Sequence, residues 1–501
     1  MSPPLRQHRE GDFMSLYEIL STIDGFLWGN PYLFSLMGIG AIIVIMSKGF
    51  VFRHFGHIMK NTLGSLTSKE ARDKNEGKSV SPFEAVCVAL GCCVGTGNIS
   101  GVAAAIAVGG PGALFWMWVW AFFGMTVKLA EATLGSYYRK KTGDGEYVGG
   151  PYYYMAEGIG NDKGWKIGFA LAGLFSFGFV AMFLSGSQAG PIAETLHASF
   201  GIPMMPFTIL FCIFVAYTLW KGIPHLAKVA SKIVPWMCIL YLCMGIIIIF
   251  KNIGNVPAAI ISIFEGAFTG TAATGGFVGA TVATTIRTGV ARAVDSNEAG
   301  MGTSPMIYAR TKTAHPVRAG LWGVFEVFVD TMVVCSVTGL SCLVTGLWSS
   351  GDTAMTLAIS VFRHEFGGIG VVMICFMMLL FGFTTATSAL GYYDAALQYL
   401  LRKWPSLSKR ASMIFKIVFG LPNIFIVATI NYTGSDFNLY WEFVNIIIWF
   451  PVLWNVIALL ILSPKFVELT KDYEARYLHK GTVKADAKLF YATEPDREID
   501  E

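Results

Sequence analysis

The sequence predicts an all-α polytopic membrane protein, because charged residues are scarce, apolar segments of helix length recur, and basic residues are confined to alternate connections. Of the 501 residues, 54% are hydrophobic and 14% are charged, and the mean hydropathy is +0.55. A soluble domain carries about 25% charged residues, so this composition excludes an ordinary soluble enzyme. The net charge of +4 is too small to indicate a nucleic-acid partner.

Eleven segments are apolar and long enough to cross a lipid bilayer, whose core requires about 20 residues of helix. In chain order they lie at 27–47, 82–109, 111–138, 166–195, 204–220, 233–250, 256–286, 319–347, 367–400, 412–430 and 438–462. We therefore expect 11 transmembrane helices.

The placement of Lys and Arg predicts how these helices are oriented. Of the 37 basic residues, 32 fall in one alternate set of connections and 4 in the other. The richer set comprises residues 48–81, 139–166, 221–232, 287–318, 402–416 and the C-terminal tail. The positive-inside rule places this set in the cytoplasm. We expect an inner-membrane protein with residues 1–26 outside, including a short interfacial helix at 14–26, a transmembrane core at 27–463 and a cytoplasmic tail at 464–501.

Two of the spans contain glycine clusters that disfavour a continuous helix. The second span contains GCCVGTGNISG (Gly91–Gly101), and the seventh contains FTGTAATGGFVGA (Phe268–Ala280). Each glycine costs about 1 kcal/mol in a helix interior relative to alanine. Unwound backbone is tolerated at membrane depth where protein or a polar cavity satisfies it. The alternative is close helix packing through small residues.

The two glycine-rich spans open two sets of five helices with opposite orientation. These sets, residues 82–250 and 256–462, form a predicted 5+5 inverted repeat that follows one extra span. Paired broken helices in such repeats indicate a secondary transporter with its binding site near the bilayer midplane. A broken helix presents free N–H groups on one side and free carbonyls on the other, which matches a zwitterion. A channel does not require this pairing.

Several long motifs resemble one transporter family. GGPGALFWMWVWAFFG (Gly109–Gly124), GGPYYYMAEGIG (Gly149–Gly160) and GGFVGATVATTIRTGVARAVDSNEAGMGTSP (Gly275–Pro305) are similar to blocks of the alanine/glycine:cation symporters, the sodium:alanine symporter family. The resemblance implies Na⁺-coupled symport of small neutral amino acids such as alanine and glycine, with Na⁺ as the co-transported ion and no organic cofactor. It also implies that the chain is not an enzyme.

The second span resembles, more distantly, the first core helix of sodium-coupled leucine transporters, and this resemblance implies a residue set for each ligand. The substrate set is Cys93, Thr96, Gly97, Asn98, Gln188, Thr274, Gly275, Gly276, Phe277 and Ala389. In it, the N–H groups of Thr96 and Gly97 would face the substrate carboxylate, and the Cys93 carbonyl its ammonium. The sodium set is Gly91, Val94, Phe381, Thr384 and Thr385.

Uncharged oxygens suit sodium, which is a hard cation. For Thr384 and Thr385 the alternative is hydrogen bonding to the carbonyl four residues earlier in the same helix.

The chain departs from the family pattern at two places. Ala389 stands where relatives commonly have Trp, and Leu184–Gly190 (LSGSQAG) replaces the usual Gly-Asn-x-x-Gln-x-Asn, so that only Gln188 is kept. Losing an indole and two amides enlarges a pocket. The hypothesis is a substrate bulkier than alanine, such as glutamine.

Ionisable residues within spans are costly and are functional candidates by default. Lys128 and Glu131 are three apart and are expected to form a structural ion pair. Asp330, with Glu326 one turn earlier, is the residue on which a proton-coupled symporter of the same fold would depend. A second charged cluster follows the seventh span and is expected to be either an inner gate or a solvated loop. It comprises Arg287, Arg292, Asp295 and Glu298.

Overall fold

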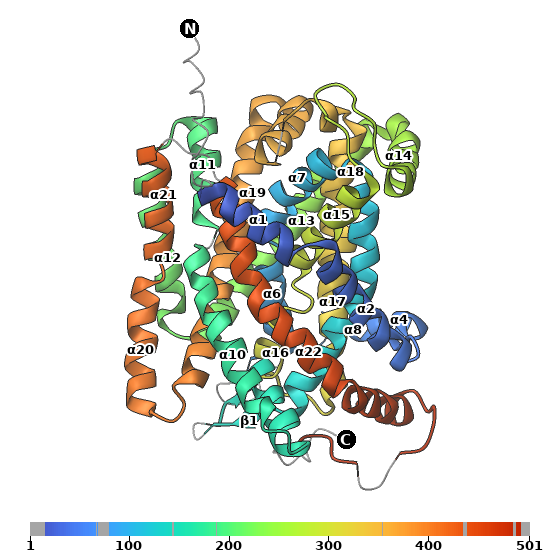
Figure 1. Cartoon of the computed structure of the whole chain (residues 1–501), viewed down its shortest axis with the longest axis vertical. Coiled ribbons are helices and arrows are strands. Elements are labelled where there is room, and N and C mark those ends of the chain that lie inside the picture. Colours follow the sequence, from blue (N-terminus) through green and yellow to red (C-terminus); the bar gives the residue numbers. More distant parts are fainter. Residues whose placement is uncertain are drawn as a thin grey trace.

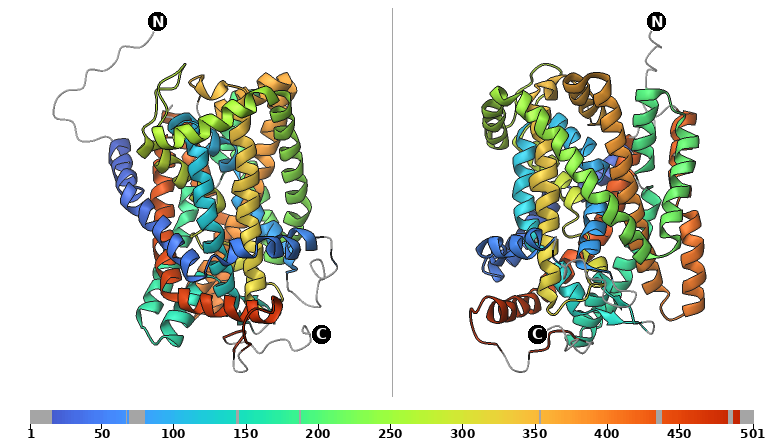
Figure 2. Two further views of the ribbon diagram at one scale, coloured as in Figure 1. Left: turned by 90° about the vertical axis from the view of Figure 1, so that its right-hand side faces the viewer. Right: turned by 180° about the vertical axis from the view of Figure 1, so that it is seen from behind.

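The computed structural model describes residues 16–66, 68, 80–142, 145–186, 188–352, 354–433, 438–483 and 487–491. The chain forms an elongated bundle of helices (Figures 1 and 2). In the described residues, eight helices are long and apolar enough to cross a membrane, and the bent pair α6–α7 makes a ninth. The protein is therefore a predominantly helical membrane protein, as predicted. The residues before 16 and after 491 lie outside the described part of the chain.

The first half of the chain runs from an N-terminal helix pair to a long helix, α13. Its helices are α1 (Leu16–Leu27), α2 (Asn30–Met46), α3 (Phe50–Arg53), α4 (Phe55–Asn61), η1 (Leu63–Ser65), α6 (Pro82–Cys93), η2 (Thr96–Asn98), α7 (Ser100–Gly109), α8 (Gly112–Tyr137), α9 (Pro151–Tyr153), η3 (Tyr154–Asp162), α10 (Ile167–Ala181), η4 (Met182–Ser185), α11 (Ala189–Phe200), α12 (Met204–Trp220) and α13 (Ile223–Lys251). A two-residue hairpin, β1 (Lys140–Lys141) with β2 (Tyr147–Val148), precedes α9.

The second half continues from a short 3-10 turn to the C-terminal helix. Its helices are η5 (Ile253–Asn255), α14 (Val256–Thr269), α15 (Val282–Asn297), α16 (Ser304–Tyr308), α17 (Pro316–Val327), η6 (Phe328–Cys335), α18 (Ser336–Val344), η7 (Leu347–Ser349), α19 (Ala354–Leu400), α20 (Pro405–Val418), α21 (Leu421–Thr433) and α22 (Asn438–Tyr477). A positive φ of 64° at Gly367 marks a kink inside α19.

The second predicted span is a broken helix, as expected from its glycines. Helix α6 begins at a capping box, in which the Ser81 hydroxyl accepts from the Glu84 backbone N–H and the Glu84 carboxylate accepts from the Ser81 N–H. It ends at Cys93, and the following segment is bent from it by 60°. The break lies at Val94 and Gly95, inside the predicted motif.

The interruption expected at Phe268–Ala280 differs in position, which is a correction. Residues 270–281 form a loop between two separate helices, α14 and α15, rather than a break within one span. The break that faces the one between α6 and α7 is at residues 298–303, between α15 and α16. Hydropathy missed α15 because this helix carries Arg287, Arg292 and Asp295.

Two further observations bear on the count of eleven. The fifth predicted span, α12, has only 17 residues, and the described part of the chain does not reproduce a full set of eleven long apolar helices.

Helix α8 packs closely against α15. A Cβ atom at Gly289 would lie 2.4 Å from the Ala113 carbonyl oxygen, so this contact requires glycine. This packing fixes α15, the helix before the second break, beside α8.

The bundle has two distinct ends. Helices α7, α14 and α18 lie toward one end, at the top of Figure 1, and β1 and the end of α22 lie toward the other. Helices α6 and α16 lie below α7 and α15 in the same view. The two breaks thus occur between the ends of the bundle, well inside it.

Candidate functional site

A small cavity of about 100 Å³ lies at the meeting point of the two helix breaks. It is lined by Cys93, Thr96 and Gly97 from the first break. From the second break and the end of α15 it is lined by Asp295, Ser296, Glu298, Met301 and Thr303. Gln188, before α11, and Thr385 and Ala389 of α19 also line it. Of the ten residues predicted for the substrate, five line this cavity: Cys93, Thr96, Gly97, Gln188 and Ala389. Of the five predicted for sodium, Thr385 lines it.

The first break releases a backbone carbonyl from its helical partner. In a continuous helix the Gly95 N–H would donate to the Gly91 carbonyl. Here it donates instead to the Asn98 side-chain oxygen at 2.9 Å and to the Cys93 carbonyl at 3.0 Å. The Gly91 carbonyl accepts from the Thr385 hydroxyl, with 3.2 Å between the two oxygens. The end of α6 and the middle of α19 therefore meet through uncharged oxygen atoms.

The residues of the predicted sodium set lie around this junction. The Thr384 hydroxyl donates to the Phe381 carbonyl at 3.0 Å and to the Leu380 carbonyl at 3.1 Å. Bonding to the carbonyl four residues earlier is the alternative to sodium binding that the sequence left open for this residue. A Cβ atom on Gly91 would lie 3.3 Å from the Cβ of Thr384. Val94 follows the last residue of α6 with non-helical dihedral angles (φ −80°, ψ 83°).

Gln188 occupies one of the two backbone donors predicted to bind a carboxylate, the Thr96 N–H. Its side-chain oxygen accepts from the Thr96 N–H at 3.2 Å and also from the Thr96 hydroxyl. Gln188 itself has a left-handed backbone (φ 60°) directly before α11. A carboxamide oxygen has the acceptor geometry of a carboxylate oxygen. Gln188 therefore marks where an acceptor group fits against η2.

Four residues of the predicted substrate set lie elsewhere. Thr274, Gly275, Gly276 and Phe277 belong to the loop between α14 and α15, where Thr274 and Phe277 pair through their backbones. The Gly276 N–H donates to the Ser349 carbonyl at 2.6 Å, and the Phe277 ring packs edge-on against Trp348. This loop packs on η7, and none of the four residues lines the cavity described above.

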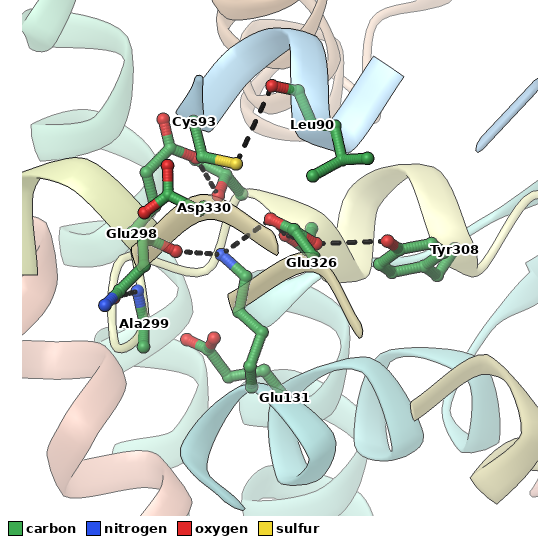
Figure 3. Close-up of polar contacts among 12 residues, drawn as sticks. Leu90, Cys93, Glu131, Glu298, Ala299, Tyr308, Glu326 and Asp330 are labelled. Carbon is green, nitrogen blue, oxygen red and sulfur yellow. Dashed lines mark hydrogen bonds and ion pairs between the residues drawn. The ribbon is translucent and has the colours of Figure 1, made fainter. Parts of the chain in front are cut away.

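Asn98 lies behind the cavity wall, where it connects the two breaks. It is fully buried, and its side-chain nitrogen donates to the Asp330 carboxylate at 2.6 Å and to the Ser296 hydroxyl at 3.0 Å. Asp330 also accepts from the hydroxyls of Ser296 and Thr331, each at 2.8 Å. Figure 3 shows Asp330 beside Cys93 at the end of α6. Asp330 thus holds η2 and the end of α15 to η6.

A buried cation, Lys128, lies at the end of α15. The Lys128 ammonium donates to the Asn297 carbonyl at 3.0 Å and pairs with Glu326 at 3.2 Å. The expected pairing of Lys128 with Glu131 is corrected, because Glu326 is its ion-pair partner and Glu131 accepts from Asn455 at 2.5 Å. A lysine at a helix C-terminus is favourable for the helix dipole. The Tyr308 hydroxyl also donates to Glu326, at 3.1 Å (Figure 3).

A wider cavity of about 700 Å³ lies on the α7 side of the breaks, lined by α1, α7, α15 and α22. Arg292 pairs with Asp295 at 2.7 Å at its base, and Asp295 lines both cavities. A Cβ atom at Gly101 would lie 2.7 Å from the Arg292 guanidinium, so the arginine lies against α7. The expected inner gate is corrected in position. Arg287, Arg292 and Asp295 line the cavity beside α1 and α7, whereas Glu298 is buried at the small cavity, because α15 begins the broken span rather than following it.

Sequence reasoning missed Ser296, Met301 and Thr303 of the second break, and it named Asp295 as a gate candidate without placing it in the substrate site. The signal in the sequence was the pair of glycines in EAGMGTSP, Gly300 and Gly302, which adopt positive φ angles of 95° and 81° within the break. The motif was recognised as a family block, but its charged residues were expected to form an inner gate or a solvated loop after the span, and not part of the substrate site. Phe179, Tyr392 and Tyr393 also line the cavity and carried no separate signal.

Known proteins resemble this chain over most of its length. The profile of the "Sodium:alanine symporter family" matches residues 13–487. The "Sodium/alanine symporter AgcS" of Methanococcus maripaludis is 34% identical over 92% of this chain and 97% of its own length. The "Probable sodium/glutamine symporter GlnT" of Bacillus subtilis is 30% identical over 91% of each chain.

Among solved structures, MhsT in complex with L-phenylalanine is similar in fold. The match has a TM-score of 0.56 and 15% identity, and it covers 79% of this chain and 99% of MhsT. At this identity the similarity shows the fold alone.

Proposed function

This chain belongs to the sodium:alanine symporter family, and on that premise we propose that it couples Na⁺ entry to the uptake of small neutral amino acids of the alanine and glycine class. It is a membrane transporter and not an enzyme. The observation that carries the proposal is the cavity at the two breaks, where backbone donors, freed carbonyls and carboxylates meet in one small space.

The cavity supplies a partner for each end of an amino acid zwitterion. The N–H groups of Thr96 and Gly97 provide donors for a carboxylate once Gln188 moves aside. The Cys93 carbonyl and the carboxylates of Asp295 and Glu298 provide acceptors for an ammonium group. Placing opposite charges at matching ends of broken helices is the arrangement that such transporters use.

The size of the cavity favours a small side chain. Its volume of about 100 Å³ is much smaller than the 700 Å³ of the wide cavity beside it. The alternative of a bulkier substrate such as glutamine rests on Ala389 and on the relative named as a probable sodium/glutamine symporter. Competition by unlabelled amino acids separates the two, because only a pocket that expands accommodates glutamine as well as alanine.

We place the coupled sodium ion between α6 and α19. The ligands in this proposal are the carbonyls of Gly91, Val94 and Phe381 and the hydroxyls of Thr384 and Thr385. Uncharged oxygens bind a hard cation without taking up a proton, which favours Na⁺ over H⁺. Asp330, on which proton coupling would depend, is already engaged by three donors.

The Arg292–Asp295 pair fits the role of a thin gate between the wide cavity and the small one. Under the positive-inside rule the α7 end faces outward and the tail lies in the cytoplasm, so the wide cavity is proposed as an outward-facing vestibule in the inner membrane. The proposed repeats, residues 82–250 and 256–462, would then exchange access by moving against each other.

Uptake into proteoliposomes tests the proposal. Labelled neutral amino acids are offered under an inward Na⁺ gradient or an inward H⁺ gradient, applied separately. We expect accumulation of alanine or glycine under Na⁺ alone. Accumulation under H⁺ alone would contradict the sodium assignment, and competition by glutamine as strong as by alanine would replace the small substrate class with the larger one.

A further inference from the structure

A third cavity, of about 830 Å³, lies away from the transport site, where α12 and α19 end and α20 begins. No carboxylate is among its lining residues. Four cationic side chains line it: Arg310, Arg402, Lys409 and Lys416. Four aromatic residues also line it: Tyr152, Tyr153, Trp220 and Tyr399. The cavity therefore combines concentrated positive charge with aromatic walls.

Two of the four cations retain an unneutralised charge. Lys416 lies 3.5 Å from Asp394, and Arg310 lies 3.4 Å from Glu146. Arg402 donates to the Tyr399 carbonyl at 2.9 Å and stacks on the Tyr399 ring at 3.9 Å, which fixes its position but leaves its charge. Neither Arg402 nor the exposed Lys409 has a carboxylate within 4 Å in the part of the chain that the structure describes. The cavity is thus poised for an anion.

The surroundings of the cavity are apolar and exposed, which distinguishes a lipid from a dissolved ion. On α20, Met413, Ile414 and Ile417 have exposed fractions of 51%, 59% and 63%. Trp220, the last residue of α12, is 56% exposed, in the position where tryptophan anchors helices at the membrane interface. Helices α12, α20 and α21 form one flank of the bundle (Figure 1). A phospholipid whose phosphate lies in the cavity would have its acyl chains beside these apolar side chains.

The cavity also lies at the end of the protein that carries the excess of basic residues. Its cations come from the connections 287–318 and 402–416, both of which belong to the cation-rich set. Basic pockets between transmembrane helices on this side bind anionic lipid headgroups. From these observations we propose that the cavity formed by α12, α19 and α20 binds the phosphate headgroup of an anionic phospholipid, with Arg402 and Lys409 as the principal contacts.

Native mass spectrometry of the full-length protein, purified in detergent, tests the proposal. The protein is equilibrated with equal amounts of phosphatidylglycerol and phosphatidylethanolamine. Wild-type protein is expected to retain phosphatidylglycerol preferentially. Each basic residue near an anionic surface contributes about 1 kcal/mol, so the double variant Arg402→Gln/Lys409→Gln should lower the retained ratio about tenfold or more.

Matched variants separate the site from general charge and from misfolding. Lys228→Gln/Lys232→Gln removes two exposed charges from α13 in the same cation-rich set and should keep the wild-type ratio, as should the charge-conserving Arg402→Lys/Lys409→Arg. An excess of inorganic phosphate should not displace the lipid. Equal retention by the Arg402→Gln/Lys409→Gln variant, or displacement by inorganic phosphate, would overturn the proposal.

Discussion

The two helix breaks face one cavity but have opposite chemistry. The break between α6 and α7 is built from Gly, Thr and Asn, and its carbonyls and N–H groups are bonded to the uncharged side chains of Thr385 and Gln188. The break between α15 and α16 begins at Glu298 and is surrounded by charge, with Arg292 and Asp295 on one side and Lys128 with Glu326 on the other. One break leaves polar backbone exposed to a ligand, whereas the other is fixed by ion pairs.

This difference separates binding from structural support. Neutral groups can exchange partners with an ion or a substrate at little cost, because each hydrogen bond contributes only about 1 kcal/mol net. A buried charge cannot lose its partner so easily, since an unpaired ion in the interior costs several kcal/mol. We therefore expect loss of the buried Lys128–Glu326 pair beside the charged break to affect folding, and substitutions at the neutral break to affect ligand binding.

The strongest test of this comparison is at Lys128. Lys128→Met leaves Glu326 buried without its cation and should lower the free energy of unfolding by about 3–5 kcal/mol. Thermal unfolding of the purified protein measures the loss. The exposed Lys232→Met is the control and should change stability by less than about 0.5 kcal/mol. The double variant Lys128→Met/Glu326→Gln should recover part of the loss, and wild-type stability of Lys128→Met would break the comparison.

The Asp330 carboxylate provides the next largest effect. Asp330→Asn replaces an acceptor of three hydrogen bonds with a group that is partly a donor. We expect a loss of about 1.5–3 kcal/mol in unfolding free energy, the range for hydrogen bonds to charged groups. Uptake should fall by the same factor at every pH, measured as initial rate against external pH. Loss of a pH dependence that the wild type possesses would instead assign proton coupling to Asp330.

Much of the fold could be predicted from the sequence, and the reason lies in local pattern. Apolar length located most spans, and glycine clustering located the break at Val94 and Gly95. The second break was misplaced because α15 has arginines facing a polar vestibule, so that hydropathy assigned it to a connection. The partnership of Lys128 with Glu326 joins residues far apart in the chain. A neighbour three residues away was the only partner that the sequence pattern indicated.

The gate pair provides a smaller effect and sharpens the boundary between the two cavities. Arg292 and Asp295 are partly exposed, so their ion pair is worth less than about 1 kcal/mol. Arg292→Gln should speed substrate release toward the α7 side by at most about fivefold, measured as exchange of labelled substrate. Arg287 also lies in the wide cavity, where its guanidinium is 3.6 Å from the Asp24 carboxylate. The variant Arg287→Gln should leave exchange unchanged. An equal effect of both variants would argue against a gate at Arg292.

The smallest effect is expected outside both breaks, at His315 before α17. Burial lowers the pKa of the His315 imidazole below its usual 6.5, although a hydrogen bond with Asp472 opposes the shift. The unfolded chain therefore takes up a proton before the folded protein does. Stability that is present above about pH 6.5 is lost as the pH falls below that value.

The variant His315→Asn keeps a side-chain acceptor for the N-terminus of α17. Its unfolding temperature should fall less on acidification than that of the wild type. An identical fall in both proteins would assign the acid sensitivity to another group.

The most direct measurement of the central claim, that the neutral junction of α6 and α19 holds the sodium ion, is stabilisation of the purified protein by NaCl relative to choline chloride, without substrate. We expect NaCl to raise the unfolding temperature of the wild type and of Thr385→Ser, which keeps the hydroxyl. Thr385→Ala should lose that increase and Asp330→Asn should retain it. A sodium response that persists in Thr385→Ala but disappears in Asp330→Asn would contradict the account and place the ion at the charged side.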